Sequence, residues 1–224
     1  MKVAICMSGL ARTFKKCYSN YLDHILSRYD CDVFVFISKD ANSDDLDVMK
    51  CAKKVVLDKN PVLDEKDLVK YKHRCKRYSL QGILQQLWKI KMCNDLMLDY
   101  QKENNIKYDW VIRCRPDLNI LRPIDDLNQL DNKYLYVPAY LRFIDKWKGM
   151  YEKDFIFDYS DGCVADQFGM SSVEIMSIYA KRYDDLEKNC LSGGNAHPEG
   201  SLQYHLQHNG IKIKFVKPLI EIVR

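Results

Sequence analysis

The segment WVIRCRPDLNI, residues 110–120, places two arginines, an aspartate and an asparagine at the end of an apolar run. Asp117 and Asn119 are two positions apart, so their side chains project the same way in an extended chain. Their oxygens are of the kind that bind a divalent cation. Arg113 and Arg115 form a second same-facing pair, suited to hold phosphates or to brace the aspartate through a bidentate hydrogen bond. The pattern also fits a salt-bridge cluster beside a proline turn.

Two more groups of polar residues follow predicted strands. In MSGLAR, residues 7–12, Gly9 lets the backbone approach a ligand closely, and Ser8 and Arg12 are placed to contact a base, ribose or phosphate. A plain strand-to-helix turn is the alternative. Ser38 ends the second predicted strand and is expected near the same rim, with a solvated loop as the alternative.

Regular elements must bring these residues together. Apolar, β-branched runs bounded by turn residues predict buried strands at residues 2–7, 32–38, 53–57 and 109–114. Residues 11–29 have apolar positions near helical spacing and the length of a crossover connection, which predicts a βαβ unit. A longer helix is predicted from Ser79 to about Asn104 because its apolar residues form a broad face.

The second half of the chain is less regular. It predicts short strands at 133–140 and 153–159, a strand or helix start at 163–172, helices at 172–183 and 199–210, and a final strand at 211–216. His205 and His208 are expected on a helix surface, because no glutamate-bearing metal motif accompanies them. The whole pattern indicates one α/β domain with a mainly parallel central sheet flanked by helices, whose ligands bind outside the carboxyl ends of the strands.

The composition is that of a packed protein, with 47% apolar and 29% charged residues over 224 positions. The net charge of +4 suits anionic ligands, and no single stripe of basic and aromatic residues indicates a nucleic-acid partner. Nine cysteines without a C-x-x-C pair favour a reducing, cytoplasmic compartment. No apolar run approaches the ~20 residues of a membrane span, and the start of the chain lacks the pattern of a signal peptide.

An apolar strand that ends in R-x-R-x-D-x-[ND], one βαβ unit after SG-x-x-R, resembles small nucleotide-sugar glycosyltransferases of the GT-A type. Enzymes of this kind encoded by large DNA viruses are among them. The resemblance covers most of the chain as an ordered series of short motifs. It implies a single GT-A-like, Rossmann-like domain over residues 1–224, with nucleotide binding in the N-terminal half and the acceptor side in the C-terminal half.

The resemblance also implies site residues. Asp117 and Asn119 would hold Mn²⁺ or Mg²⁺ against the donor diphosphate, although DLN departs from the Asp-x-Asp element of the family at its second ligand. His197 corresponds to a late histidine that completes the metal site in similar enzymes. Gln81, Gln85 and Lys89 form one stripe of the long helix, with Tyr78 at its start. Of these residues Tyr78 and Gln85 are expected at the nucleotide pocket, with a solvated helix face as the alternative.

Two carboxylates are candidates for the chemistry itself. Asp166 and Gln167 resemble an Asp-Gln pair beside the donor sugar in glycogenin-like retaining enzymes, which favours retention. Asp166 or Glu199 would be the base of an inverting enzyme, although Glu199 also suits a helix start. The expected reaction moves a sugar from a nucleoside diphosphate sugar to an acceptor hydroxyl on a glycan or glycoprotein. A UDP-sugar is the favoured donor. A nucleotidyltransferase and a non-catalytic module that binds nucleotides or nucleic acid are the alternatives.

Overall fold

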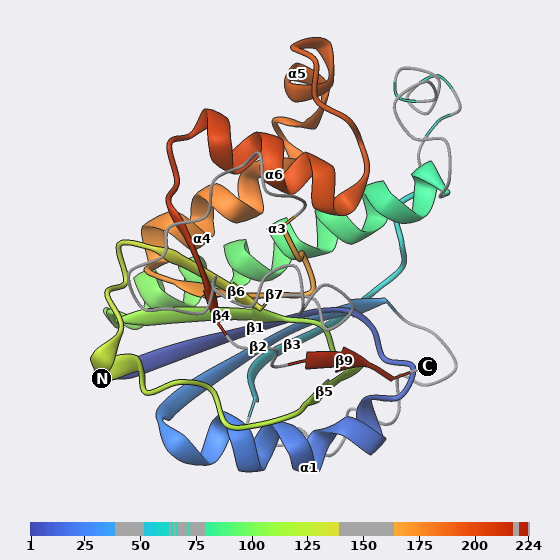
Figure 1. Cartoon of the computed structure of the whole chain (residues 1–224). Helices are drawn as coiled ribbons and strands as arrows, with labels where there is room; N and C mark the ends of the chain where they lie inside the picture. The colour runs from blue at the N-terminus through green and yellow to red at the C-terminus, as the bar shows by residue number, and fades with distance from the viewer. Residues whose placement is uncertain are drawn as a thin grey trace.

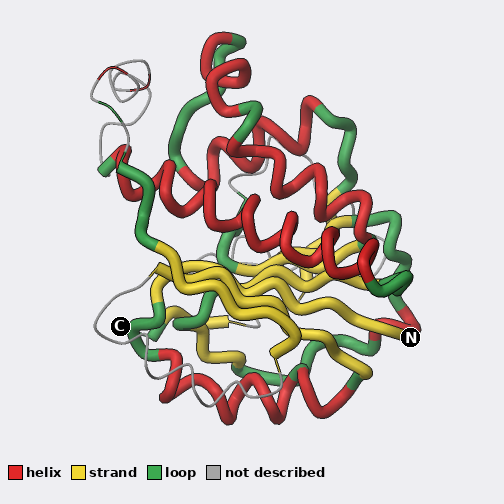
Figure 2. The backbone as a smooth tube through the Cα atoms, turned by 180° about the vertical axis from the view of Figure 1, so that it is seen from behind, coloured by secondary structure: helices red, strands yellow, loops and turns green. Residues whose placement is uncertain are grey.

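A seven-stranded sheet forms the centre of the protein, with helices on both of its faces (Figures 1 and 2). The computed structural model describes residues 1–38, 52–62, 64, 66, 71, 79–138, 164–216 and 220–223. Helix α1 covers one face of the sheet, and α3, α4 and α6 cover the other (Figure 1). The molecule is therefore built in three layers around two apolar interfaces.

The sheet has the strand order β3-β2-β1-β4-β7-β6-β8. Its strands are β1 (Lys2–Leu10), β2 (Asp30–Ser38), β3 (Ala52–Asp58), β4 (Trp110–Cys114), β6 (Leu135–Pro138), β7 (Phe168–Ser171) and β8 (Ile213–Val216). β7 runs antiparallel to β4 and β6, and the other neighbouring pairs are parallel. The predicted α/β domain with a mainly parallel sheet is confirmed. A second, antiparallel sheet pairs β5 (Leu118–Ile120) with β9 (Ile220–Ile222). The strand at 211–216 was predicted to be the last one, but β9 follows it.

The helices of the described chain agree with the sequence pattern in their order. They are α1 (Phe14–His24), α3 (Leu80–Glu103), α4 (Val173–Ala180), α5 (Leu186–Leu191) and α6 (Pro198–His208), with short 3-10 helices η1 (Leu26–Arg28), η4 (Leu127–Gln129) and η7 (Lys181–Tyr183). Ser79 caps α3 by accepting a hydrogen bond from the Gly82 amide. The predicted strand at 153–159 lies outside the described residues, and α5 was not predicted.

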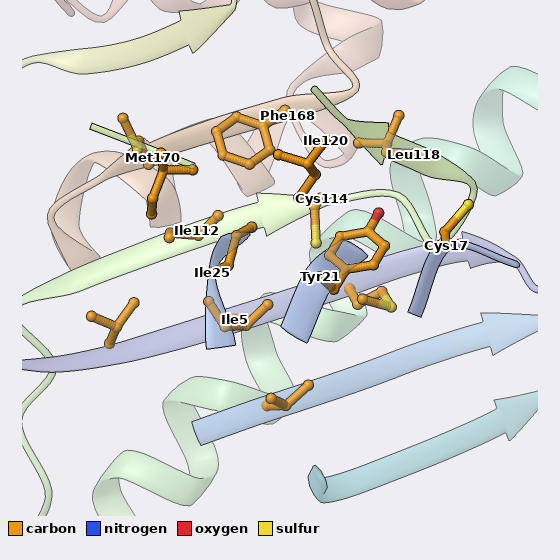
Figure 3. Close-up of a cluster of buried hydrophobic side chains, with 14 of the residues drawn as sticks. Ile5, Cys17, Tyr21, Ile25, Ile112, Cys114, Leu118, Ile120, Phe168 and Met170 are labelled. Carbon is orange, nitrogen blue, oxygen red and sulfur yellow. The ribbon is translucent and has the colours of Figure 1, made fainter. Parts of the chain in front are cut away.

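Alternation along the central strands decides which residues face which helices. Ile112 and Cys114 of β4 pack into the α1-side core with Tyr21 (Figure 3). Val111, on the opposite face, packs into the core beneath α3 and α4. Arg113 has the parity of Val111, so a charged side chain enters the helix α3 side of the sheet at the end of a buried strand.

None of the described helices has the length and apolar character needed to cross a membrane. Of the described cysteines, Cys6, Cys17, Cys93 and Cys114 are buried free thiols. Cys93, for example, lies in the core beneath α3 and donates a weak hydrogen bond to the Met7 carbonyl at 3.5 Å. The cysteines therefore act as small apolar core residues here, and the cytoplasmic location stays a prediction.

His205 is buried, so the expectation that it lies on a helix surface was wrong. Its Nε2 lies 2.7 Å from the carbonyl oxygen of Ile178, so Nε2 carries the proton and donates. Nδ1 is then the acceptor for the side-chain amide of Asn189, at 3.2 Å. Burial lowers the pKa of His205, although the bond to Ile178 opposes the shift. His208, one turn's distance along α6, is exposed as expected.

The lowered pKa of His205 predicts a loss of stability in mild acid. Below pH about 6.5, the ordinary pKa of histidine, the unfolded chain takes up a proton that the folded protein resists, so the free energy of unfolding falls as the pH falls. Urea unfolding at several pH values should show this slope in the wild type and a smaller slope in His205→Gln. The exposed His208→Gln variant is the control and should keep the wild-type slope. An equal slope in His205→Gln would contradict the assignment.

Candidate functional site

A cavity of about 320 Å³ opens at the carboxyl ends of β1 and β4, beneath the first turns of α3. Its described lining consists of Ser8, Gly9, Leu10, Arg12, Asn60, Ser79, Gly82, Ile83, Gln85, Gln86, Lys89, Arg113 and Arg115. This is the edge at which an open α/β sheet binds its ligands. Six of the predicted contact residues line this one cavity, namely Ser8, Gly9, Arg12, Gln85, Arg113 and Arg115.

The lining of this cavity, which we call the basic cavity, is strongly cationic. Four positive side chains line it, namely Arg12, Lys89, Arg113 and Arg115. Among the described lining residues there is no aspartate or glutamate. A concave site with low-dielectric walls and charges of one sign concentrates ligands of the opposite sign. The basic cavity is therefore suited to an anion, and guanidinium groups favour phosphate in particular.

Two buried groups on the wall of the cavity have polar atoms without a hydrogen-bond partner among the described residues. Arg113 is 2% exposed; its Nη1 donates to the backbone carbonyl of Asp166, but Nε and Nη2 have no partner. The hydroxyl of Ser8, 1% exposed, has none either. Buried polar groups are normally satisfied, and an unpaired buried charge is costly. The arrangement is explained if a ligand oxygen accepts these hydrogen bonds.

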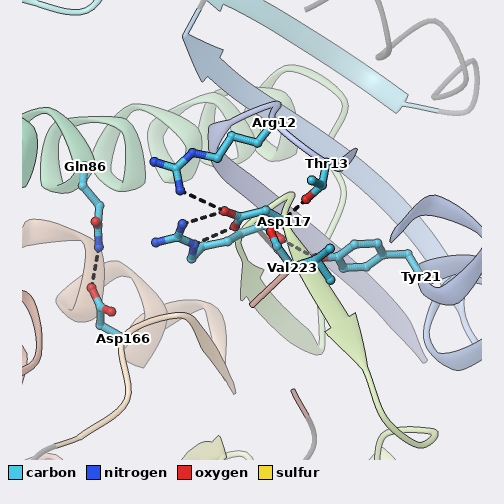
Figure 4. Close-up of polar contacts among 8 residues, drawn as sticks. Arg12, Thr13, Tyr21, Gln86, Asp117, Asp166 and Val223 are labelled. Atoms are coloured by element: carbon cyan, nitrogen blue, oxygen red, sulfur yellow. Dashed lines mark hydrogen bonds and ion pairs between the residues drawn. The ribbon is translucent and has the colours of Figure 1, made fainter. Parts of the chain in front are cut away.

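Asp117 lies behind this wall, held by two arginines (Figure 4). The Arg115 nitrogens Nε and Nη2 donate to Oδ1 and Oδ2 of Asp117, each at 2.8 Å. Arg12 Nη1 approaches Oδ2 at 3.4 Å from the loop after β1. Burial works against the charge of Arg115, but the bonds to Asp117 outweigh it and raise the Arg115 pKa. In the structure Arg115 therefore braces Asp117 through a bidentate hydrogen bond, one of the two arrangements that the sequence allowed.

The residues predicted as metal ligands do not fit a divalent cation in this arrangement. Asp117 is 1% exposed, and both of its carboxylate oxygens are taken by guanidinium groups. Asn119 lies within β5, whereas His197 Nδ1 lies 2.9 Å from Glu199 Oε2 at the start of α6. Over the part of the chain that the structure describes, no three His, Cys, Asp or Glu side chains are grouped to hold a metal.

The second predicted carboxylate, Asp166, borders the cavity through Gln86. Gln86 lines the cavity, and its Nε2 donates to Asp166 Oδ2 at 2.6 Å (Figure 4). Asp166 is itself 1% exposed, and Arg182 Nη2 lies 3.7 Å from the same oxygen. Burial lowers the pKa of Arg182, which Asp166 partly offsets. Asp166 therefore balances the buried arginines beside the cavity without itself lining it.

Glu199 is linked to Asp166 indirectly, through the adjacent residue Gln167. Its Oε1 accepts a hydrogen bond from Gln167 Nε2 at 3.3 Å, and its other oxygen faces His197. The carbonyl of Pro198, next to it, accepts from Arg182 Nη1 at 2.7 Å. The start of α6 is thus tied to the Asp166 cluster, and Glu199 also has the helix-start position that the sequence suggested.

The remaining predicted residues are placed as follows. Ser38 is buried, and its hydroxyl donates at 2.5 Å to Asn60 Oδ1, so it supports a cavity residue without lining the cavity. Gln85 lines the cavity, and its amide donates to the Pro61 carbonyl at 2.9 Å. Tyr78 lies outside the described residues. Two other polar residues of the lining were not predicted. Gln86 is adjacent to the predicted Gln85 on α3, and Asn60 is not marked by any sequence pattern.

Gly9 has a conformation that only glycine adopts readily, with φ of +150°. A Cβ atom at this position would lie 3.1 Å from Cδ of Pro116, in the turn between Arg115 and Asp117. Gly9→Ala should therefore lower the free energy of unfolding by about 1–3 kcal/mol, the usual cost of such backbone strain. It should also weaken ligand binding, because the turn that carries Arg115 is displaced. Urea unfolding and calorimetry measure the two effects.

Gly169 offers a matched control for this substitution. It lies in β7, and a Cβ there would meet its nearest neighbours at 3.6 Å, an ordinary contact. Gly169→Ala should leave both stability and binding close to those of the wild type. If Gly9→Ala behaves like Gly169→Ala, the close approach of β1 to the Pro116 turn does not shape the cavity.

Comparison with known proteins places this chain in a family but attaches no activity to it. No curated protein matches the sequence. A family model described as a domain of unknown function, DUF7796, matches residues 1–165, which include β1, α3, β4 and every described residue that lines the basic cavity. The chain belongs to the DUF7796 family.

Proposed function

We propose that this protein is a glycosyltransferase that binds a nucleoside diphosphate sugar in the basic cavity and transfers the sugar to an acceptor hydroxyl. The observation that carries the proposal is the pair of buried, unpartnered donors on the cavity wall, Arg113 and Ser8, among four cationic side chains. A diphosphate supplies the oxygens these donors require. The resemblance of the R-x-R-x-D-x-N and SG-x-x-R motifs to nucleotide-sugar enzymes supports the choice of donor.

The division of the chain also supports this assignment. Every described residue that lines the cavity lies between Ser8 and Arg115, in the half expected to bind the nucleotide. The Asp166 carboxylate comes from the other half and meets the cavity through Gln86, and Glu199 accepts a hydrogen bond from the neighbouring Gln167. We therefore place the donor nucleotide over β1 and β4, and the transferred sugar toward Gln86 and Asp166.

In this mechanism the arginines stabilise the departing diphosphate, on which negative charge grows as the glycosidic bond breaks. Asp166 lies on the side where the sugar gains positive charge. Retention remains our preferred stereochemical outcome because of the Asp166–Gln167 pair, with Glu199 as the candidate base for inversion. NMR of the anomeric proton in the product distinguishes the two.

A thermal-shift screen tests the proposal against its alternatives. The ligands are UDP-, GDP- and dTDP-sugars, UTP, and a single-stranded oligonucleotide. A ligand present at 100 times its Kd stabilises the folded state by about 2.7 kcal/mol, which raises Tm by roughly 5–10 °C for a chain of this size. We expect this for at least one nucleotide sugar, followed by its hydrolysis or transfer. Stabilisation by the oligonucleotide alone, or pyrophosphate release from UTP, would support the alternatives instead.

A further inference from the structure

We propose that the basic cavity holds the donor diphosphate through arginine side chains without a divalent cation, and that Asp117 positions Arg115 and Arg12 for this task. The inference rests on the proposed function, which it makes more specific. It reverses the role that the sequence suggested for Asp117, from metal ligand to positioning residue.

First, both carboxylate oxygens of Asp117 already accept hydrogen bonds from arginine. Its two oxygens accept from Nε and Nη2 of Arg115, and Oδ2 is also approached by Arg12. A cation at Asp117 would have to displace Arg115, whose guanidinium lies largely within the protein. A divalent cation would then face a positive charge that has lost its partner.

Second, the backbone oxygens around Asp117 are occupied as well. The Asp117 carbonyl accepts from the amide of Val223 at 2.9 Å, and the Arg115 carbonyl accepts from the hydroxyl of Tyr21. The Val223 carbonyl accepts from Thr13 at 3.0 Å (Figure 4). Mg²⁺ and similar hard cations require several oxygen ligands in a defined geometry. These three carbonyl oxygens instead accept hydrogen bonds from donors of the protein.

Third, the arginines keep donors for a ligand after binding Asp117. Arg115 uses Nε and Nη2 on the carboxylate, which leaves Nη1, while Arg113 presents its unpartnered Nε and Nη2. Arg12 stands at the mouth with φ of +40°, an unusual backbone conformation for a residue with a side chain, and its side chain is 46% exposed. The wall, turn and mouth thus each contribute a guanidinium.

Fourth, the charges suffice without a metal. Asp117 offsets one of the four positive charges of the lining, and the three that remain still balance the phosphate charge of a nucleoside diphosphate. Guanidinium groups bind phosphate oxygens in bidentate geometry, so they also fix the orientation of the diphosphate. The arginines can therefore perform the two tasks usually given to the cation, charge neutralisation and orientation.

Calorimetry with two probes tests this inference. UDP and inorganic pyrophosphate are titrated into the wild-type protein, once with EDTA and once with MnCl₂. We expect Kd values that agree within about threefold between the two conditions. Binding of UDP that requires Mn²⁺ would overturn the inference and leave the proposed function standing. If neither UDP nor any nucleotide sugar binds under either condition, the proposed function fails together with it.

Asp117→Asn separates a positioning residue from a metal ligand. The amide keeps the size of the carboxylate but cannot hold Arg115 by two charge-assisted bonds, so UDP should bind about tenfold or more weakly in EDTA, and by the same factor in MnCl₂. A metal ligand would give a loss in MnCl₂ only, which would overturn the inference. Arg12→Met, at the exposed mouth, should weaken binding in EDTA about tenfold as well without loss of fold.

Asp32→Asn is the matched control for Asp117→Asn. Asp32 is equally a buried carboxylate, with Lys2 and Lys53 at 3.3 and 3.5 Å and the Tyr108 hydroxyl at 2.8 Å. It lies near the amino end of β2, at the opposite edge of the sheet from the cavity. Asp32→Asn should lower Tm without changing the Kd for UDP. If both variants change Kd equally, the effect of Asp117→Asn reflects general loss of stability, and the inference is overturned.

Discussion

Replacing Arg113 by methionine is expected to weaken UDP binding by about 100-fold or more, while the protein stays as stable as the wild type or becomes more stable. Arg113 is buried, and two of its guanidinium nitrogens have no partner in the part of the chain that the structure describes. Its charge also lowers the pKa of Arg182, which burial already lowers. Methionine keeps the unbranched shape and removes this buried charge, so the fold loses one hydrogen bond, to Asp166, and gains relief from repulsion.

Weaker UDP binding combined with unchanged or higher stability would show that Arg113 serves ligand binding and not the stability of the fold. Calorimetry with UDP gives the change in Kd, and thermal unfolding without ligand gives the change in Tm. Arg122 provides the control, because it too has buried Nε and Nη2 atoms without a partner, yet it pairs with Asp125 and does not line the cavity. Arg122→Met should leave Kd unchanged. Unchanged affinity in Arg113→Met would show that the cavity wall is not the anion site.

The elements that position Arg113 could be predicted from sequence because of their burial. The parallel strands β1, β2 and β4 are covered on both faces, so each is a nearly continuous apolar run that local composition reveals. Parallel strands end at a common edge, and from this rule alone the residues at the ends of β1 and β4 were expected to lie together, as they do in the cavity lining. The polar residues selected at the ends of those runs, among them Ser8, Arg12 and Arg113, line the cavity, and their role as ligand contacts stays a prediction.

The partner of Asp117 could not be predicted in the same way. The R-x-D spacing permits both a metal ligand and a bidentate brace, and the choice depends on whether Arg115 turns back onto its neighbour. The contact with Arg12 joins residues 105 positions apart, and Arg12 makes it from a backbone with a positive φ, +40°. Neither feature leaves a periodic pattern in the sequence. The R-x-D spacing alone therefore leaves both roles of Asp117 open, and tertiary contacts decide between them.

The same limit explains the residues and strands that were missed. Gln85 and Gln86 both lie on α3, and 100° of helical rotation separates them, so only the orientation of the helix over the sheet decides which reaches Asp166. The strands β5 and β9 have three residues each and pair across about 100 positions, too short for a local signal. His205 looked like a surface residue because its partners, Ile178 and Asn189, come from other elements.

Replacing Asp166 by asparagine should separate binding from transfer. The carboxylate lies between Gln86 and the buried Arg182, so its loss makes the surroundings of the cavity more positive by one charge. A diphosphate should then bind as tightly as before or more tightly. The transferred sugar, which gains positive charge in an oxocarbenium-like transition state, should be stabilised less, so that kcat falls by about 100-fold or more.

This opposite effect on the two constants is the diagnostic result for Asp166. A residue that only maintains the fold would weaken binding and lower turnover together, with a matching fall in Tm, and that outcome would contradict the assignment. Glu199→Gln tested in parallel identifies the carboxylate on which transfer depends more strongly. Asp184→Asn removes an exposed carboxylate that pairs with Lys91 at 3.5 Å, and it should change neither constant. A loss of turnover in Asp166→Asn with undiminished UDP affinity would place the reacting sugar beside Gln86, on the side of the cavity away from Arg12.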